Sequence, residues 1–339
     1  MSHPLIDGLG VSPDVFIHNF DVAGDRALII RLSAEQRRNA SFLDDRILGK
    51  GVEGGWANWA DIEPAARRAP TVSPAFIFHV GHCGSTLISR LLEEASGVRS
   101  LREPMSLRTF ATVLADSEDG VSLWSAEEVQ RRLSCYLNVA TAGAPTLIKA
   151  TSWCGALAKL TAGPALFCHS RADAYIATML GGANNPIDLK LNAPIRLRRL
   201  RRLCGGEIAR LSALSPGELA AMSWAAETAT IAAAMTRDAR RFHPIEFDDF
   251  LKAPADGLAA AAAHLGLAAP PEKIAAALSG PLMRTYSKDA SFDYSPKDRK
   301  EILADYLARH KREIERGVKW LGDAAGAHAA IRAGAERFA

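Results

Sequence analysis

The sequence lacks the features that mark membrane, secreted and nucleic-acid-binding proteins. Its 41 Lys and Arg residues nearly balance its 38 Asp and Glu residues, so a net charge of +3 provides no strong field for nucleic acid. No apolar run is long enough to cross a bilayer, and the start MSHPLIDGLG lacks the basic and apolar regions of a signal peptide. We therefore expect a cytoplasmic protein with no membrane span and no nucleic-acid partner.

Cysteine is also scarce and unpatterned. The five cysteines contain no CxxC pair and no metal-ligand spacing, which favours reduced thiols and predicts no metal site: Cys83, Cys135, Cys154, Cys168 and Cys204. Cys83 lies in a glycine-containing turn, where it is either a small packing residue or a reactive thiol. We favour the packing role.

That turn is the most informative stretch of the chain. A short apolar run at 75–80 predicts a buried strand, and Leu87, Ile88, Leu91 and Leu92 recur at helical spacing after it. Between them lies Gly81-His82-Cys83-Gly84-Ser85-Thr86. A strand, a turn of small residues and a helix start together form an anion cradle, because main-chain N–H groups converge there and the helix N-terminus adds partial positive charge.

The turn has no lysine after Gly84, where a Walker A loop places the residue that contacts the β- and γ-phosphates. A metal-dependent NTPase is therefore disfavoured. The segment instead resembles the 5′-phosphosulfate loop of the PAPS-dependent sulfotransferases (PAPS is 3′-phosphoadenosine 5′-phosphosulfate), which runs roughly Pro-Arg-Ser-Gly-Thr-Thr. Gly81 stands for the Pro and His82 for the Arg. The resemblance covers roughly residues 74–320.

The resemblance implies metal-independent, in-line transfer of a sulfuryl group from PAPS to the hydroxyl or amine of a small-molecule or peptide acceptor. Three alternatives remain: an ordinary strand–turn–helix junction, a P-loop kinase-like phosphotransferase, and a non-catalytic nucleotide-binding relative. The acceptor and the oligomeric state stay open at this stage.

The resemblance also implies catalytic roles for three residues. Glu103 corresponds to the general base, unless it only forms a salt bridge with Arg102 or Lys149. Lys149 matches a lysine that faces the sulfonate, or is a solvated strand-end residue. His82 is a donor to the sulfonate or bridging oxygen, or a loop histidine with a satisfied hydrogen bond.

Cofactor contacts are implied at the turn and at two later segments. The turn residues Gly81 to Thr86, that is Gly81, His82, Cys83, Gly84, Ser85 and Thr86, would cradle the 5′ end. Arg171 and Thr178 fit the 3′-phosphate site if one residue is deleted, whereas an ungapped comparison puts His169 or Ser170 in place of the arginine. A late basic loop would add Arg284, Ser287 and Lys288.

Strand-like and helix-like segments alternate after the turn. Runs ending at Arg102, Lys149 and His169, and a run at 242–247, read as further strands, which predicts βαβ units and a parallel sheet. We expect an α/β fold: a P-loop three-layer sandwich with a central parallel sheet flanked by helices, plus a small N-terminal appendage. The charged strand-end residues are expected at the ligand-binding edge of the sheet.

The expected boundaries are 1–70 for the appendage, with a hairpin of 15–22 and 27–32, then 71–325 for the main domain and 326–339 for a loosely held tail. Capping boxes at Ser125 with Glu128 and at Ser215 with Glu218 predict two helix starts, and Ser295 opens the last long helix. Residues 181–214 read as irregular. Their arginine cluster is a solvated helix face, or a lid or patch for an acidic acceptor.

Overall fold

The centre of the molecule is a five-stranded parallel sheet. The computed structural model describes residues 4–286, 289–293 and 295–339. The sheet order is β5-β6-β4-β7-β8, with these strands at Arg99–Arg102, Thr146–Lys149, Ala75–His79, Ala165–His169 and Phe242–Glu246. All four neighbouring pairs are parallel. The predicted α/β fold is confirmed.

The chain order of the strands identifies the ligand-binding edge. From β4 the chain crosses to the sheet edge at β5, returns to β6 beside β4, and then continues at β7 on the other side of β4. The direction of winding therefore changes at β4. Open α/β sheets bind ligands in the crevice outside the carboxyl ends of the strands at such a point, and the predicted glycine turn follows β4 there.

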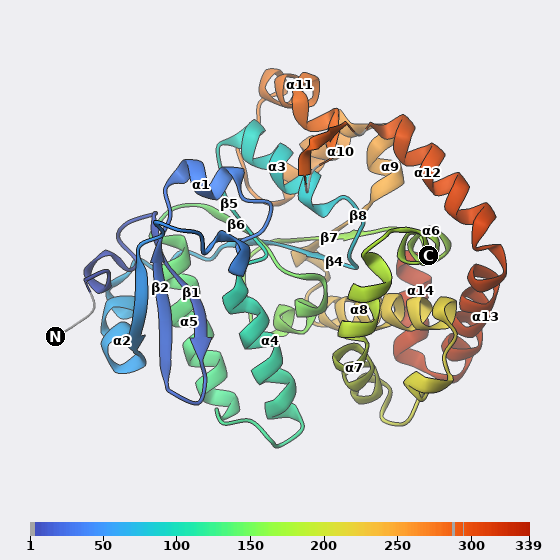
Figure 1. The fold of residues 1–339 in the computed structure, drawn as a ribbon, viewed down its shortest axis with the longest axis horizontal. Coiled ribbons are helices and arrows are strands. Elements are labelled where there is room, and N and C mark those ends of the chain that lie inside the picture. Colours follow the sequence, from blue (N-terminus) through green and yellow to red (C-terminus); the bar gives the residue numbers. More distant parts are fainter. Residues whose placement is uncertain (1–3, 287–288, 294) are drawn as a thin grey trace.

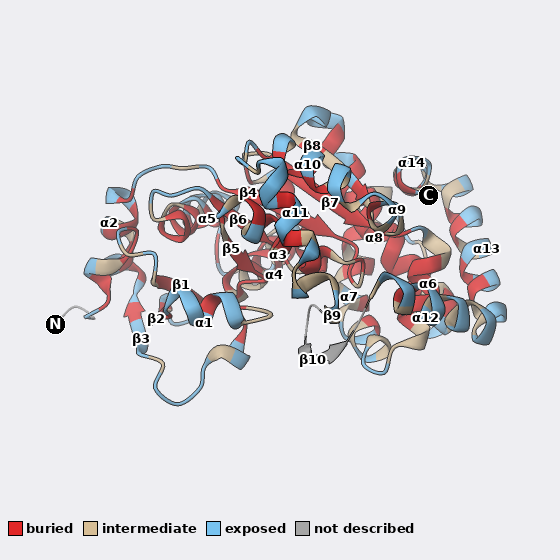
Figure 2. Ribbon diagram, turned by 90° about the horizontal axis from the view of Figure 1, so that it is seen from above, coloured by how far each residue is buried: buried red, intermediate tan, exposed pale blue. Residues whose placement is uncertain are grey.

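Helices cover both faces of the sheet (Figure 1). One layer holds α3 (Ser85–Ser96), α10 (Pro254–His264) and α11 (Pro271–Ser279), and the other holds α4 (Met105–Glu118), α7 (Asn185–Cys204), α8 (Pro216–Arg237) and α14 (Ala329–Phe338). Buried residues concentrate on the sheet and α8, and exposed ones on the outer helices (Figure 2). The buried length of α8 matches its alanine-rich sequence, because small side chains let neighbouring helices approach closely.

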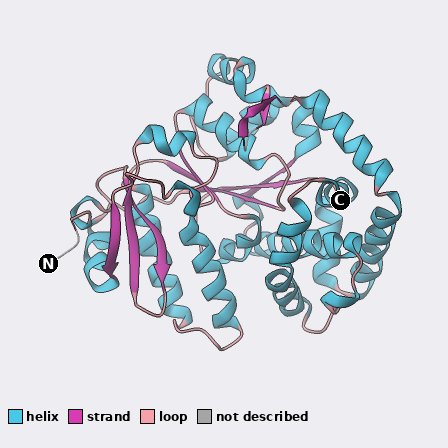
Figure 3. Cartoon of the chain, viewed as in Figure 1, coloured by secondary structure: helices cyan, strands magenta, loops and turns pink. Residues whose placement is uncertain are grey.

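The N-terminal part forms its own antiparallel sheet at one end of the molecule (Figure 3). The predicted hairpin is confirmed as β1 (Val15–Asp21) and β2 (Arg26–Arg31), and β3 (Gly54–Asn58) adds to β2. The helices of this region are α1 (Ala34–Asn39), α2 (Trp59–Arg68) and α5 (Ala126–Thr141). Phe20 of β1 packs against Trp59, Phe110, Trp124 and Tyr136, so the two parts share one apolar core.

A buried arginine fastens the N-terminal part to the parallel sheet. Arg102, at the end of β5, is 1% exposed and donates to the carbonyl oxygens of Arg37, Arg38 and Ala40 at the end of α1. Its Nη1 lies 2.7 Å from Glu93 Oε2, and Arg37 Nη1 lies 2.9 Å from Glu93 Oε1. These contacts satisfy carbonyl groups that a helix C-terminus leaves without internal partners.

Three expectations differ from the structure. Residues 185–204 are not irregular but form α7, whose Leu189, Ala193, Leu197 and Leu200 are buried at helical spacing. The last long helix breaks at His310 into α12 (Pro296–Arg309) and α13 (Lys311–Ala327). The tail is not loosely held: it forms α14, and Phe338 is 1% exposed against the ring of Phe167 on β7.

The remaining elements are short. They are α6 (Ala172–Gly181), α9 (Phe247–Lys252), β9 (Thr285–Tyr286), β10 (Asp289–Asp293), and the 3₁₀ helices η1 (Ile6–Gly8), η2 (Asp45–Ile47), η3 (Ser152–Lys159), η4 (Leu211–Ala213), η5 (Ala239–Arg241) and η6 (Pro281–Met283). No helix within the described residues combines the length and apolar character needed to cross a membrane.

Candidate active site

Two cavities meet at the carboxyl edge of the sheet. The first, about 650 Å³ in volume, is lined by the glycine turn, the start of α3 and residues of α12, and we call it the turn cavity. The second, about 850 Å³, lies between α4 and α7, and we call it the groove. Six residues line both: Phe42, Arg46, His79, His82, Glu103 and Asn184. Any chemistry between a ligand of the turn cavity and a ligand of the groove would occur beside them.

The glycine turn has the backbone that its sequence predicts. Gly81, His82 and Gly84 have φ values of +96°, +52° and +69°, in the region that favours glycine. A Cβ on Gly84 would lie 1.9 Å from the ring of Phe247, so only glycine fits there. Ser85 and Thr86 begin α3 and line the turn cavity. The start of α3 therefore presents main-chain donors to the cavity, as an anion site requires.

Cys83 has the packing role rather than a reactive one. Its side chain is completely buried, and its Sγ donates to the carbonyl oxygen of Cys168 at 3.1 Å. Burial raises the pKa of the Cys83 thiol to about 11. Because the thiolate is the reactive form, this side chain is a poor nucleophile near neutral pH.

Glu103 and Lys149 are adjacent because their strands are adjacent. Arg102 pairs with Lys149 in the β5–β6 register, and the Glu103 N–H donates to the Lys149 carbonyl at 2.6 Å. The Lys149 ammonium, 1% exposed, forms an ion pair with Glu103 Oε1, and Arg108 Nη2 lies 3.3 Å from Oε2. Of the two salt bridges considered for Glu103, that with Lys149 forms, whereas Arg102 contacts Glu93 instead. Lys149 is therefore not a solvated residue.

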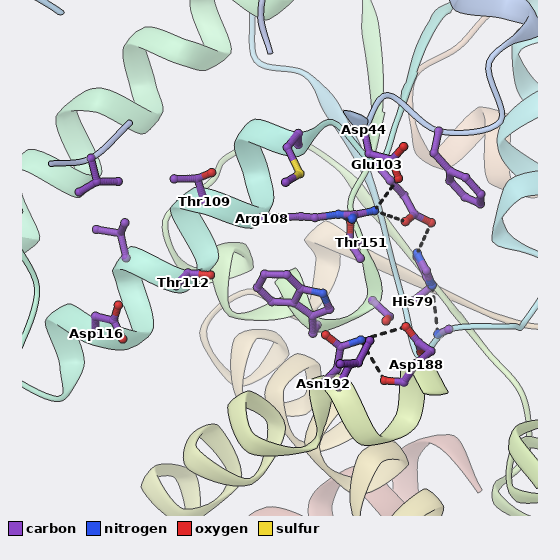
Figure 4. A pocket seen from close by; sticks show the side chains of 18 of the residues that line it. Asp44, His79, Glu103, Arg108, Thr109, Thr112, Asp116, Thr151, Asp188 and Asn192 are labelled. Atoms are coloured by element: carbon purple, nitrogen blue, oxygen red, sulfur yellow. Dashed lines mark hydrogen bonds and ion pairs between the residues drawn. The ribbon is translucent and has the colours of Figure 1, made fainter. Parts of the chain in front are cut away.

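A histidine that the sequence analysis missed lies beside this pair (Figure 4). His79 Nδ1 accepts from the Gly81 N–H at 3.0 Å, which places the ring proton on Nε2, and Nε2 donates to the Ala150 carbonyl at 2.8 Å. This arrangement describes a neutral imidazole. Its Nε2 is 3.9 Å from Glu103 Oε1. In the sequence His79 ends a buried strand and has no motif that distinguishes it.

His82 connects the turn to α7. Its Nε2 lies 3.9 Å from Asp188 Oδ2, and Asp188 accepts a hydrogen bond of 2.9 Å from Asn192 on the next turn of the helix. The side chain of His82 is 20% exposed and lines both cavities. It can therefore reach a ligand in either one.

The residues expected to bind the 3′-phosphate do not lie together in the structure. Thr178 lines the turn cavity, but Arg171 does not line either cavity, and its side chain is 69% exposed. His169 and Ser170 are buried and also line neither. Arg284 is exposed, donates to the Ser279 carbonyl and lines neither cavity. Ser287 and Lys288 lie outside the described residues.

Arg299 on α12, which the sequence analysis did not single out, lies beside Thr178. It is buried, lines the turn cavity, and its Nη1 donates to Thr178 Oγ1 at 3.2 Å. Its Nε lies 3.3 Å from Asp248 Oδ1, whereas its buried Nη2 has no hydrogen-bond partner among residues 4–286, 289–293 and 295–339. A buried guanidinium nitrogen without a partner is costly unless a ligand satisfies it. Arg299 carried no sequence signal, because only folding brings α12 to Thr178.

The arginine cluster of α7 divides into two groups: Arg198, Arg201 and Arg202 are partly exposed and pair with surface carboxylates, whereas Arg196 and Arg199 are buried. Arg196 is completely buried and contacts Glu227 Oε1 of α8 at 2.9 Å and Ser152 Oγ at 2.9 Å. Arg199 contacts Glu227 Oε2 at 2.7 Å. The buried group thus anchors η3, which lines the groove, to α7 and α8. Within the described residues, no cluster of three or more His, Cys, Asp or Glu side chains is placed to hold a metal ion.

Comparison with known proteins adds several structural similarities. No family model and no curated protein matches the chain. Among solved structures, the sulfotransferase domain from the curacin biosynthetic pathway matches with 17% identity and a TM-score of 0.40, over 75% of this chain and 99% of that one. Sulfotransferase STF9 from Mycobacterium avium matches with 13% identity and a TM-score of 0.39, over 73% and 79%.

A sulfotransferase from Alicyclobacillus acidocaldarius matches with 15% identity and a TM-score of 0.35, over 73% of this chain and 97% of that one. The matched structures carry sulfotransferase titles. Their TM-scores are low, and they carry no information about the roles of individual residues in this chain.

Proposed function

We propose that this protein is a sulfotransferase that moves a sulfuryl group from PAPS to an acceptor hydroxyl or amine by in-line transfer. The observation that carries the proposal is the meeting of two cavities at Glu103, one of them built on a glycine turn and a helix N-terminus. Bound PAPS would supply an activated sulfuryl group on a phosphate leaving group. Such a reaction needs positioned cations and a base.

The turn cavity has donors suited to both ends of PAPS. Gly84, Ser85 and Thr86, at the start of α3, line the turn cavity and suit the 5′ end, because the first N–H groups of a helix have no partner within the helix. Arg299 and Thr178 suit the 3′-phosphate, because guanidinium binds phosphate oxygens in pairs and Arg299 Nη2 has no partner in the part of the chain that the structure describes. We therefore assign the 3′-phosphate role to Arg299 in place of Arg171.

Glu103 is the proposed general base. It lines both cavities, and one of its oxygens already contacts Lys149 while the other is within reach of Arg108. The carboxylate would take the proton of the acceptor hydroxyl as the bond to sulfur forms. Lys149 and His82 would donate to the oxygens on which negative charge develops, the role that fixed cations perform in such sites.

The test is Glu103→Gln, which keeps the shape of the side chain and removes its basicity. We expect kcat to fall about 10²- to 10⁴-fold, the usual contribution of general base catalysis. Binding of adenosine 3′,5′-bisphosphate, measured by calorimetry, should persist. Transfer is measured from labelled PAPS to a panel of acceptors.

Glu93→Gln is the matched control. Glu93 is a similarly buried carboxylate that also pairs with two cations, Arg37 and Arg102, but it lines neither cavity. If Glu103 has only a structural role, both variants lose stability and keep a similar share of activity. Equal activities in the two variants would therefore refute the base assignment.

The kinase-like alternative is separated by the ligand that stabilises the protein. We expect adenosine 3′,5′-bisphosphate to raise the melting temperature in the presence of a chelator, because ligand binding to the folded state stabilises it. Stabilisation that requires magnesium with ATP would instead favour a phosphotransferase.

A further inference from the structure

The groove is long and has helical walls. Met105, Arg108, Thr109, Thr112 and Asp116 follow one face of α4 and line it (Figure 4). Met105 and Asp116 are eleven positions apart, which corresponds to roughly 16 Å at 1.5 Å per residue. Asp188, Leu191 and Asn192 line it from one face of α7. A cavity of this length is much larger than a small alcohol needs.

Two contacts fix the direction of the groove. At one end Asp188 lies 3.9 Å from His82, which lines both cavities together with Glu103. At the other end Arg198, farther along α7, lies 3.0 Å from Asp116 on α4. The Val121 N–H donates to the Asp116 carbonyl, which places the loop after α4 at the same end. The two helices therefore run away from Glu103 together.

Exposed aliphatic side chains gather towards the far end of the groove, where Asp116 also lies. Glu103 and Arg108 lie at the near end, and the hydroxyls of Thr109 and Thr112 follow. Val121 and Leu123, both 71% exposed, line the far end, and Leu191, 74% exposed, lies between the two ends. Large aliphatic side chains that are exposed to solvent around one cavity indicate an apolar ligand.

The charges of the groove argue against an acidic acceptor. Arg46 and Arg108 line it, and both contact Asp44, at 2.7 Å and 3.4 Å. Asp116 and Asp188 also line it. An anionic ligand would meet these carboxylates and would have to compete for guanidinium groups that already have partners.

We propose that the acceptor is an elongated, uncharged alcohol whose hydroxyl lies at Glu103 and whose hydrocarbon chain extends past Leu191 to Val121 and Leu123. This inference rests on the proposed sulfotransferase activity and specifies its substrate class. The hydroxyl end meets the base and its cations, and the chain covers the exposed aliphatic residues.

The first experiment measures sulfate transfer to straight-chain primary alcohols from butanol to dodecanol. We expect kcat/KM to rise about two- to fourfold with each added methylene until the chain passes the far end of the groove. Dodecanol with a carboxylate at its far end should lose this gain. Equal kcat/KM along the series, or a preference for an acidic tyrosine-containing peptide, would overturn the proposal.

The second experiment compares two aspartate substitutions on α7. Leu191→Asp places a charge in the groove, whereas Ile187→Asp changes a residue one turn away that is 58% exposed and does not line it. We expect the ratio of kcat/KM for dodecanol to that for butanol to fall about tenfold in Leu191→Asp and to stay at the wild-type value in Ile187→Asp. Equal ratios in both variants would refute the groove assignment.

Direct binding separates the two proposals. If adenosine 3′,5′-bisphosphate does not bind and no transfer occurs, the sulfotransferase proposal fails. Calorimetric binding of dodecanol that weakens in Leu191→Asp and not in Ile187→Asp supports the groove assignment independently of transfer. Absence of dodecanol binding to a protein that still binds the bisphosphate overturns the substrate class alone.

Discussion

The contact between Gly84 and Phe247 gives the turn its sharpest sequence requirement. In Gly84→Ala, holding alanine at a positive φ costs about 1 kcal/mol. The new methyl group would also overlap the Phe247 ring, and such overpacking costs about 1–3 kcal/mol. We expect lower stability in thermal unfolding and weaker binding of adenosine 3′,5′-bisphosphate, because Phe247 also lines the turn cavity.

Gly97→Ala is the control at the other end of the same helix. Gly97 has a φ of +72°, close to the +69° of Gly84, but a Cβ there meets no atom within 4 Å. It should show the backbone strain alone and leave bisphosphate binding unchanged. If the two variants lose equal stability and bind equally well, the ring contact has no role in the site.

His169 makes stability depend on pH. Burial lowers the pKa of its imidazole to about 4, against an ordinary value of about 6.5. Between pH 6.5 and pH 4 the unfolded chain binds a proton on His169 and the folded chain does not. The free energy of unfolding is therefore highest above pH 6.5 and falls as the pH drops towards 4, by up to about 3 kcal/mol. His169→Phe keeps an aromatic ring against Phe167 and Phe338. We expect its free energy of unfolding, measured with urea, to change less between these pH values than that of the wild type.

An unchanged pH dependence in this variant would assign the effect to other groups. The same denaturation series on His328→Gln, at the junction of α13 and α14, provides a comparison with a histidine that is only half-buried.

The sequence was most informative where neighbouring strands determine contacts. Glu103 and Lys149 end adjacent parallel strands, so their proximity could be predicted from strand order alone. Arg299 could not be found in this way, because its contact with Thr178 spans 121 residues and depends on how α12 docks. Arg171 does follow a strand, but its side chain points to solvent, and strand order does not determine side-chain direction.

At the scale of elements, the helix pair α7 and α8 is held by a buried charge cluster. Glu227 is 1% exposed and contacts both Arg196 and Arg199. Glu227→Gln would leave two buried guanidinium groups without a counter-charge, which typically costs about 3–5 kcal/mol. We expect a large fall in the denaturation midpoint and weaker acceptor binding, because Arg196 also holds Ser152 in the groove wall.

Asp119→Asn removes a carboxylate that contacts Arg198 and Arg202 of the same helix at the surface. Its cost should be about 1 kcal/mol or less, because solvent screens exposed pairs. A loss as large as that of Glu227→Gln would show that burial does not decide the energetics of the cluster.

The sequence predicted where helices begin more reliably than it predicted which segments are helical. The capping boxes at Ser125, Ser215 and Ser295 all form, because each depends on residues three apart in the chain. The α7 helix was missed because Gly181-Gly182 and Pro186 read as breaks, although proline is tolerated in the first turn of a helix. The tail was misjudged because its alanines and glycines do not reveal that Ile331 and Phe338 pack inward.

At the scale of the whole molecule, the two cavities are separate spaces that meet at one point. Under the proposed function, PAPS and acceptor bind at the same time, and the groove does not require the nucleotide to leave first. The Cys83 thiol, buried and with a pKa of about 11, offers no route for a covalent enzyme intermediate. We expect initial-rate plots to intersect, as in a sequential mechanism, and parallel lines would contradict direct transfer.

The segment that contains Phe42 and Arg46 connects the two parts of the molecule. The Leu43 N–H donates to the Arg102 carbonyl at 2.7 Å, and the Met105 N–H donates to the Leu43 carbonyl at 3.0 Å. The segment is thus held between the end of β5 and the start of α4, and Phe42 and Arg46 line both cavities.

Under the proposed function, this shared wall touches both ligands. Any shift of the segment on occupation of one cavity would reshape the other, and the resulting change in affinity would be the same in both directions. The connection between β2 and β3 would then let the nucleotide and the acceptor sense each other before any bond changes.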